Sequence, residues 1–143
     1  MTHRILVRSI LIDVPSSDYD RTQAFWATAL DARSRRGTEH PEYHVLDDAA
    51  ARDRVLVQDV GTDSARFHID IETDDVEAEL TRLRACGAVE VERHEFRHPW
   101  PVGRRHAKKR TDYYVVLRDP AGLPFCVVPA ESDDFPERSR EVD

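Results

Sequence analysis

The sequence has little cysteine and no long apolar run. Its 143 residues include two cysteines, Cys86 and Cys126, which are too few for the disulfide framework of a small secreted domain. No stretch approaches the roughly 20 apolar residues that a membrane-spanning helix needs, and residues 1–8 lack the apolar run of a signal peptide. The sequence therefore predicts a soluble cytoplasmic protein with reduced thiols and no membrane partner.

An excess of positive charge is also missing. The formal net charge is −7, so the whole chain is expected to be repelled by nucleic acid and by anionic membranes. Hydrophobic residues make up 40% of the chain, which is enough to bury a core of ordinary size. We expect one domain, or two small halves that share a core.

The clearest local signal lies in residues 66–88. Side chains alternate strictly along its first part: Phe67, Ile69 and Ile71 on one face, and His68, Asp70 and Glu72 on the other. Alternation of this kind predicts a strand with two unlike faces. A predicted helix follows. Residues 73–75 supply its cap, apolar residues recur at helical spacing over 76–86, and Gly87 terminates it. We expect the apolar strand face to pack under this helix, with Cys86 as a packing residue. The polar face is either solvated or the wall of a site.

The rest of the chain supplies similar elements. Strands are expected at 5–14, 43–46, 54–60, 89–93, 113–117 and 124–128, with a loop at 31–41. A helix is expected over 19–30, and its apolar stripe is predicted to be core: Tyr19, Phe25, Trp26, Ala29 and Leu30. The acidic segment 131–143 is expected to be a frayed tail.

This order is a repeat of one strand, one helix and three strands. The first module is expected at about 5–61 and the second at about 65–129. Neither copy can bury a helix and a sheet alone, but a pair can. The predicted fold is α+β, with two βαβββ modules forming one cupped mixed sheet, helices outside and a cleft inside.

Motifs in the second half carry a resemblance to a known superfamily. They are His68-Ile69-Asp70-Ile71, the helix over 74–88 and the turn Asp119-Pro120-Ala121-Gly122 with the strand after it. In this order and spacing they resemble the glyoxalase-like branch of the vicinal oxygen chelate superfamily, which includes glyoxalase I, extradiol dioxygenases and bleomycin-resistance proteins. The resemblance covers about residues 5–129. It implies the glyoxalase/bleomycin-resistance fold, and a homodimer is expected.

The resemblance also implies four positions for metal ligands. They fall on or near Ser9, Gln58, His68 and Cys126. Only His68 is a strong ligand, because a serine, an amide and a thiol do not make the usual histidine and carboxylate set. The expectation is therefore no cofactor, with a divalent metal as the less favoured alternative. His68 can instead be an inward histidine bonded to a neighbouring strand.

A mixed polar and apolar face is predicted inside the sheet. Its lining is expected to comprise Ser9, Leu11, Asp13, Leu56, Gln58, His68, Asp70, Glu72, Cys126 and Val128. Such a lining is typical of small-molecule sites. His68 with Asp70 can act as an acid–base pair, with His68 as the candidate catalytic residue, or the carboxylates can be merely solvated. Cys126 is expected to be an inert thiol, because the spacing places no base beside it.

The segment 93–110 is unusually basic. It holds seven arginines and lysines against one acid, Glu95, and prolines flank Trp100. It can be a solvated loop, which includes the case of a loop at a dimer interface. It can be a lid in which Trp100, Arg104, Arg105 and Lys108 bind an anionic ligand. A nucleic-acid patch is the third reading, and the overall charge argues against it.

Three classes of function follow. The first is a small-molecule-binding protein without the usual metal centre, whose ligand is a small organic compound, anionic or aromatic. The second is an enzyme of the lyase, isomerase or dioxygenase type that uses His68. The third is an interaction module that uses the basic segment.

Overall fold

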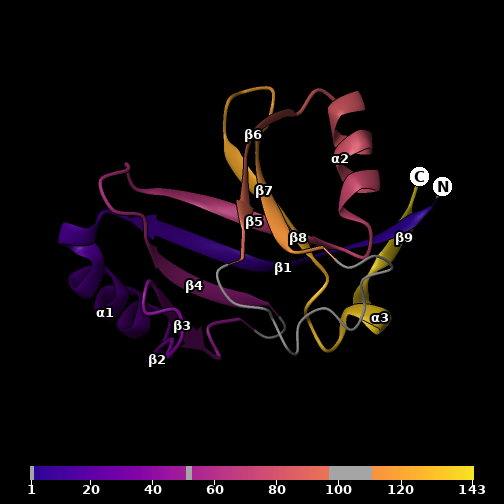
Figure 1. Cartoon of the computed structure of the whole chain (residues 1–143). Coiled ribbons are helices and arrows are strands. Elements are labelled where there is room, and N and C mark those ends of the chain that lie inside the picture. The colour runs from indigo at the N-terminus through magenta and orange to yellow at the C-terminus, as the bar shows by residue number, and fades with distance from the viewer. Residues whose placement is uncertain (1, 51–52, 97–110) are drawn as a thin grey trace. The chain divides into compact units, whose positions relative to one another are not determined.

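The computed structural model describes residues 2–50, 53–96 and 111–143. Within them the chain forms, in order, β1 His3–Val14, the short 3-10 helix η1 Ser16–Asp18, α1 Tyr19–Ala29, β2 Arg33–Arg36, β3 Tyr43–Asp47, β4 Arg54–Asp59, β5 Arg66–Thr73, α2 Val76–Ala85, β6 Val89–Glu95, β7 Tyr113–Arg118, β8 Pro124–Pro129, α3 Phe135–Arg138 and β9 Arg140–Val142 (Figure 1). The predicted repeat of strand, helix and three strands is present twice, from β1 to β4 and from β5 to β8. The α+β fold class is therefore confirmed.

The chain forms two compact units. The first-half unit comprises residues 8–69, and the second-half unit comprises residues 1–7 and 70–143. In the first-half unit β2 pairs with β3 and β3 with β4, both antiparallel, and β4 pairs with β1 in parallel. In the second-half unit β5 pairs with β8 in parallel, and β8, β7 and β6 follow in antiparallel order. Each unit is described separately below.

Helix α1 covers one face of the first-half sheet. Its buried cluster comprises Ile12, Val14, Tyr19, Leu46, Val55 and Val57, with Trp26 packed against it. The predicted core role of Phe25, Ala29 and Leu30 is wrong, since Phe25 is 60% exposed and the other two are also exposed. Adjacent helical residues point about 100° apart, so Phe25 cannot face the sheet together with Trp26.

The predicted loop 31–41 contains a strand. Strand β2 pairs with β3, and both Arg33 and Arg35 contact the carboxylate of Asp47 across the pair. The sequence lacked a signal for it because β2 consists of three arginines and a serine, with no apolar alternation.

Helix α2 is the better anchored of the two long helices. Its buried cluster comprises Val76, Leu80, Val115, Leu117 and Val127, from the helix and from β7 and β8. The Asp75 carboxylate accepts a hydrogen bond from the Ala78 amide at 3.1 Å, and Gly87 has a φ of +102° just beyond the helix. The predicted helix, its cap region and its terminator are confirmed, because Gly87 adopts a conformation that L side chains rarely take.

The apolar face of β5 differs from its prediction. Ile71 is buried, but Phe67 is 61% exposed and Ile69 is also exposed. Phe67 contacts the edge of Trp26, with ring centroids 6.4 Å apart. Helix α2 starts only at Val76, and its core cluster does not include these two residues. Their predicted place under this helix is therefore wrong. Cys86 is exposed as well, so its predicted packing role is also wrong.

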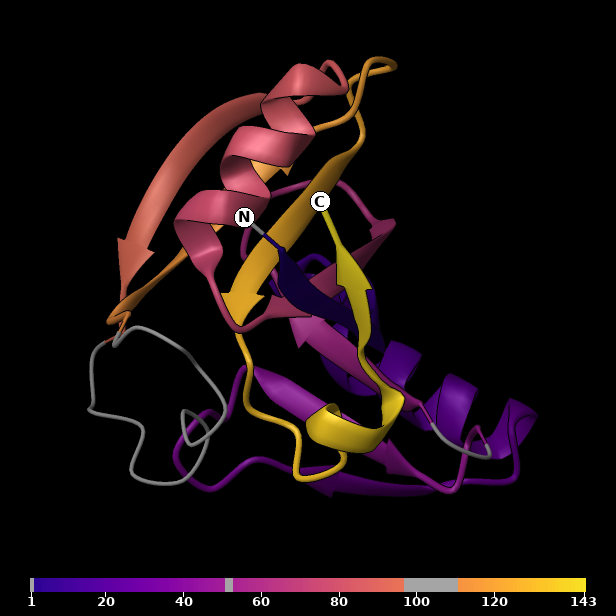
Figure 2. The ribbon, with the colours of Figure 1, turned by 90° about the vertical axis from the view of Figure 1, so that its right-hand side faces the viewer.

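The acidic C-terminal segment is folded rather than frayed. It forms α3 and then β9, which pairs antiparallel with the start of β1 through His3 and Val142 (Figure 2). Phe135 is buried in a cluster with Leu6 and Ala130. One buried aromatic ring and one strand pairing outweigh the charge of the segment. No helix in the described part of the chain is long and apolar enough to cross a membrane.

Candidate functional site

A buried carboxylate holds His68 in the first-half unit. The His68 Nδ1 atom lies 2.5 Å from Asp13 Oδ2 on β1. The Asp13 side chain is 1% exposed and that of His68 is 10% exposed. An ionised carboxylate can only accept hydrogen bonds. In the pair with ionised Asp13, Nδ1 of His68 therefore carries the hydrogen and donates the hydrogen bond. Such a bond fixes the orientation and the tautomer of the imidazole ring.

The sequence pointed to Asp70 as the acid–base partner, whereas the structure pairs His68 with Asp13. Asp13 belongs to the predicted inner face of β1, but nothing in the sequence pattern indicated an acid–base role for it. Its signal was a carboxylate on the same strand face as Ser9 and Leu11, at the end of the predicted strand. The alternative of an inward histidine bonded to a neighbouring strand describes this contact well.

Asp13 retains an unused hydrogen-bonding atom. Its Oδ1 is buried and has no hydrogen-bond partner among the described residues. The Arg66 Nε atom lies 3.6 Å from Oδ2, close enough to lower the electrostatic cost of the buried charge. Gln58 is the register partner of Asp13 on β4 and donates to the Tyr43 hydroxyl at 3.2 Å. Thus Gln58 lies beside the pair but contacts Tyr43.

Two predicted apolar lining residues lie in the next row of the same strand pair. Leu11 and Leu56 are register partners on β1 and β4 and are both buried. Within the first-half unit an apolar pair therefore adjoins the polar pair of Asp13 and Gln58. This arrangement gives the face around His68 a mixed character.

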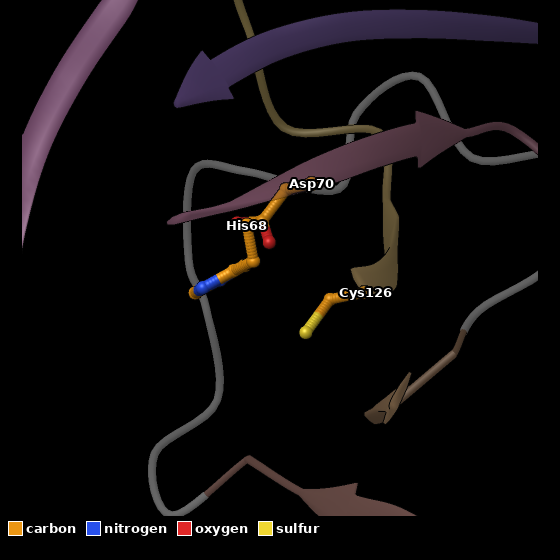
Figure 3. Close-up of side chains that lie close together, drawn as sticks. All are labelled: His68, Asp70 and Cys126. Atoms are coloured by element: carbon orange, nitrogen blue, oxygen red, sulfur yellow. The ribbon is translucent and has the colours of Figure 1, made fainter. Parts of the chain in front are cut away.

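In the second-half unit, Asp70 and Cys126 are register partners on β5 and β8. Both side chains are half-buried, and both appear in Figure 3 together with His68. His68 precedes Asp70 by two residues on one continuous strand, so their side chains leave β5 on the same side (Figure 3). The predicted common face of His68 and Asp70 is thus present along β5.

Glu72, the next residue on that face, has a structural role. Its Oε1 accepts hydrogen bonds from the amides of Glu131 and Ser132 at 2.9 and 2.8 Å, and its Oε2 accepts one from the Ser132 hydroxyl at 2.5 Å. Glu72 is 2% exposed. Through these hydrogen bonds it anchors the chain that follows β8. It does not line an open face.

The residues at the first metal position implied by the superfamily do not fit a divalent cation. The Arg54 guanidinium donates to Ser9 Oγ from Nε at 3.2 Å and from Nη2 at 3.1 Å. A permanent positive charge at this point repels a cation, and a hydroxyl is a weak ligand. At the second position the Gln58 amide is engaged with Tyr43.

Most of the basic segment lies outside the described residues, including Trp100, Arg104, Arg105 and Lys108. Arg93 is described, and it contacts Glu90 and Glu77, each at 2.6 Å. The hydrogen bond from Arg93 holds the pKa of Glu77 below its usual value. Arg93 therefore joins β6 to α2.

A family model described as "Glyoxalase-like domain" matches residues 9–128. The chain belongs to the glyoxalase-like domain family. The resemblance in the sequence to this branch of the vicinal oxygen chelate superfamily is thus confirmed. A comparison with curated proteins gave no match.

Solved structures share the fold of this glyoxalase-like protein. A Mn(II)-bound glyoxalase from Novosphingobium aromaticivorans is 19% identical, with a TM-score of 0.54, and the match covers 93% of this chain and 43% of that one. A glyoxalase/bleomycin resistance protein/dioxygenase superfamily member from Vibrio splendidus is 14% identical over 87% of this chain and 99% of that one, with a TM-score of 0.50. A structure described as an NAD-dependent benzaldehyde dehydrogenase from Legionella pneumophila is 10% identical over 86% and 98% of the two chains, with a TM-score of 0.54. At these identities the likeness concerns the fold alone.

Proposed function

We propose that this glyoxalase-like protein binds a small organic molecule beside His68, without the usual metal centre of its superfamily. The observation that carries the proposal is the hydrogen bond between His68 and the buried Asp13. Burying a carboxylate costs free energy unless it is paired, and here it is paired with a histidine that remains partly accessible. A preset donor or acceptor beside apolar residues is what small-molecule sites use to orient a ligand.

Two further features support a ligand rather than a metal at this place. The Arg54 guanidinium against Ser9 disfavours a divalent cation at the first ligand position. Leu11 and Leu56 place apolar side chains in the row next to Asp13 and Gln58. Together they favour an uncharged or anionic organic group over a hydrated metal ion.

The test is ligand-observed NMR on the protein in EDTA. The probes are a fragment set that spans aliphatic acids, amines, alcohols and aromatic rings. His68→Gln retains a donor that can reach Asp13, so it removes the imidazole with the least damage to the fold. His40→Gln is the matched control, because His40 lies outside this cluster and contacts Glu42.

We expect at least one class of fragment to bind the wild-type protein in EDTA. His68→Gln should weaken the binding of that fragment about tenfold or more, and His40→Gln should leave the binding unchanged. Binding that requires added manganese or zinc would contradict the proposal. So would equal binding by the two variants, or the absence of binding by any fragment.

A second candidate is an enzyme that moves a proton with His68, and the Asp13 contact favours it specifically. An imidazole held by a carboxylate at Nδ1 can take a proton at Nε2, while the carboxylate stabilises the imidazolium that forms. The reaction class is proton removal from a carbon next to a carbonyl group. The proton passes from that carbon to Nε2, and a proton from solvent returns to the carbon by the same route.

Deuterium exchange tests this second candidate. Hydroxyacetone is incubated with the protein in D2O, and the loss of its C–H signals is followed by NMR. We expect exchange above the buffer rate, a loss of about a hundredfold in His68→Gln and of about tenfold in Asp13→Asn, and no change in His40→Gln. Exchange at the buffer rate with the wild-type protein would remove this candidate and leave the binding proposal to the fragment test.

A further inference from the structure

The exposed face of α1 carries no charge over most of its length. Charged residues make up 34% of the chain, but residues 22–30 include none. Ala24 and Thr28 are nonetheless exposed, and Phe25 is 60% exposed. On α2, by contrast, the exposed residues include Glu77 and Arg84, as is usual for a helix face in contact with water. The face of α1 therefore differs from an ordinary solvated face.

Aromatic rings extend this face onto β5. The Phe25 and Trp26 rings meet edge to face, with centroids 5.4 Å apart and planes 83° apart. The Trp26 ring in turn contacts Phe67, which is 61% exposed. All three residues lie in the first-half unit. They form a contiguous aromatic patch with two exposed rings, and such a patch is typical of an interaction site.

Opposite charges stand at the two ends of the uncharged stretch. Arg21 precedes Phe25 by one turn on the same side of α1, and its side chain is 78% exposed. Asp31 follows the C-terminal end of the helix and is also exposed. Arg21 contacts Asp18, whereas Asp31 forms no ion pair with any residue that the structure describes. Each end of this face can therefore meet the other end of an identical face with opposite charge.

We propose that the aromatic patch, defined by Phe25, Trp26 and Phe67, binds the same patch on a second copy of this chain, with the two α1 helices antiparallel. A two-fold axis through the patch brings the two Phe25 rings together. It also sets Arg21 of each copy beside Asp31 of the other.

A second copy suits the patch better than a membrane surface does. The paired faces are complementary in charge, and their contact removes two exposed rings per copy from water. An anionic membrane would instead be repelled by the net charge of −7. This interface goes beyond the homodimer expected from the sequence, which had no surface assigned, and it does not depend on the ligand proposed beside His68.

The first test is sedimentation velocity over a range of protein concentrations. Phe25→Glu places a charge in the middle of the patch. The matched control is Leu123→Glu, because Leu123 is an equally exposed apolar residue in the second-half unit. Urea unfolding at concentrations that keep the chain monomeric establishes that each variant is folded.

We expect the wild-type protein and Leu123→Glu to form a dimer with the same dissociation constant. Phe25→Glu should weaken the dimer about thirtyfold or more, as expected for a central aromatic residue of an interface. A wild-type protein that stays monomeric at every concentration would overturn the proposal, and so would a dimer that Phe25→Glu leaves intact. Binding of the monomer to phosphatidylcholine vesicles through Phe25 would assign the patch to a membrane instead.

The second test uses charge reversal to probe the antiparallel arrangement. Arg21→Glu sets two acids beside each other in its own dimer, and Asp31→Lys sets two cations beside each other. Each variant alone should dimerise about threefold to tenfold more weakly than the wild-type protein. An equimolar mixture, followed with a fluorescent label on one variant, should form a heterodimer within about twofold of the wild-type affinity, because both contacts then join opposite charges. A mixture that associates no more tightly than the separate variants would overturn this arrangement.

Discussion

The two units share one order of elements but differ in how their helices are held. Helix α2 has a side-chain cap from Asp75, a glycine terminator and a core of fully buried residues from α2, β7 and β8. Helix α1 has no side-chain cap from the residues described, and Phe25 beside its buried stripe is exposed. The difference indicates that the second-half unit contributes more of the stability, while the first-half unit carries the buried pair of Asp13 and His68.

The largest expected effect concerns the two cores. Leu80→Ala should destabilise the protein by about 2–5 kcal/mol, because Leu80 on α2 is fully buried against β7 and β8. Phe25→Ala should cost less than about 1 kcal/mol, because most of that ring already contacts water. Urea unfolding of the monomeric chain, monitored by circular dichroism, measures both. Similar losses for the two variants would break the comparison.

The second effect concerns the fastening of the C-terminal segment. Glu72→Gln should cost about 1–3 kcal/mol, because an amide cannot accept all three hydrogen bonds from Glu131 and Ser132. Hydrogen exchange over residues 131–142 should rise in this variant. Glu92→Gln, at an exposed pair with His94, is the control and should have little effect. Unchanged exchange in Glu72→Gln would argue against the fastening role.

A smaller effect concerns the helix caps. Asp75→Ala should cost about 1 kcal/mol, since it leaves the Ala78 amide without its acceptor. Asp18→Ala should cost less than about 0.5 kcal/mol, because Asp18 pairs with Arg21 only at the surface. Equal costs in urea titrations would show that α1 depends on its cap as much as α2 does.

The smallest effect is a pH dependence in the first-half unit. Burial, with a contribution from Arg36, lowers the pKa of His44, and Asp20 opposes the shift. The unfolded chain therefore binds a proton more readily at this position. The contribution of neutral His44 to the free energy of unfolding is fully present above the pKa of the unfolded chain, about 6.5. It is lost as the pH falls from there toward the lower folded pKa.

His44→Gln should reduce this loss between pH 7.5 and 5.5, and His40→Gln should not. Urea midpoints at the two pH values give the result. If the urea midpoint of His44→Gln falls between the two pH values as much as that of the wild-type protein, the acid sensitivity belongs to another group.

Much of the fold could be predicted because both helices and most strands carry periodic apolar residues. The exceptions have physical causes. Strand β2 is all polar, β9 depends on pairing with β1, and Phe67 and Ile69 follow the alternation of a buried strand but are exposed. Alternation reports which residues share a face, but not which face is covered.

The candidate site could be predicted only in part. His68 and its face followed from the pattern of β5, whereas its partner Asp13 lies 55 residues earlier and depends on the pairing of strands. The role of Glu72 depended on the fold of the C-terminal segment, which the charge pattern concealed.

The most direct test of the central claim is the ¹⁵N NMR spectrum of the His68 ring, with and without the tightest fragment from the EDTA screen. The account predicts a proton on Nδ1, a shift of the Nε2 resonance on saturation with the fragment, and loss of the tautomer preference in Asp13→Asn. A ring protonated at Nε2 and not at Nδ1, or a His68 spectrum that the fragment leaves unchanged, would contradict it.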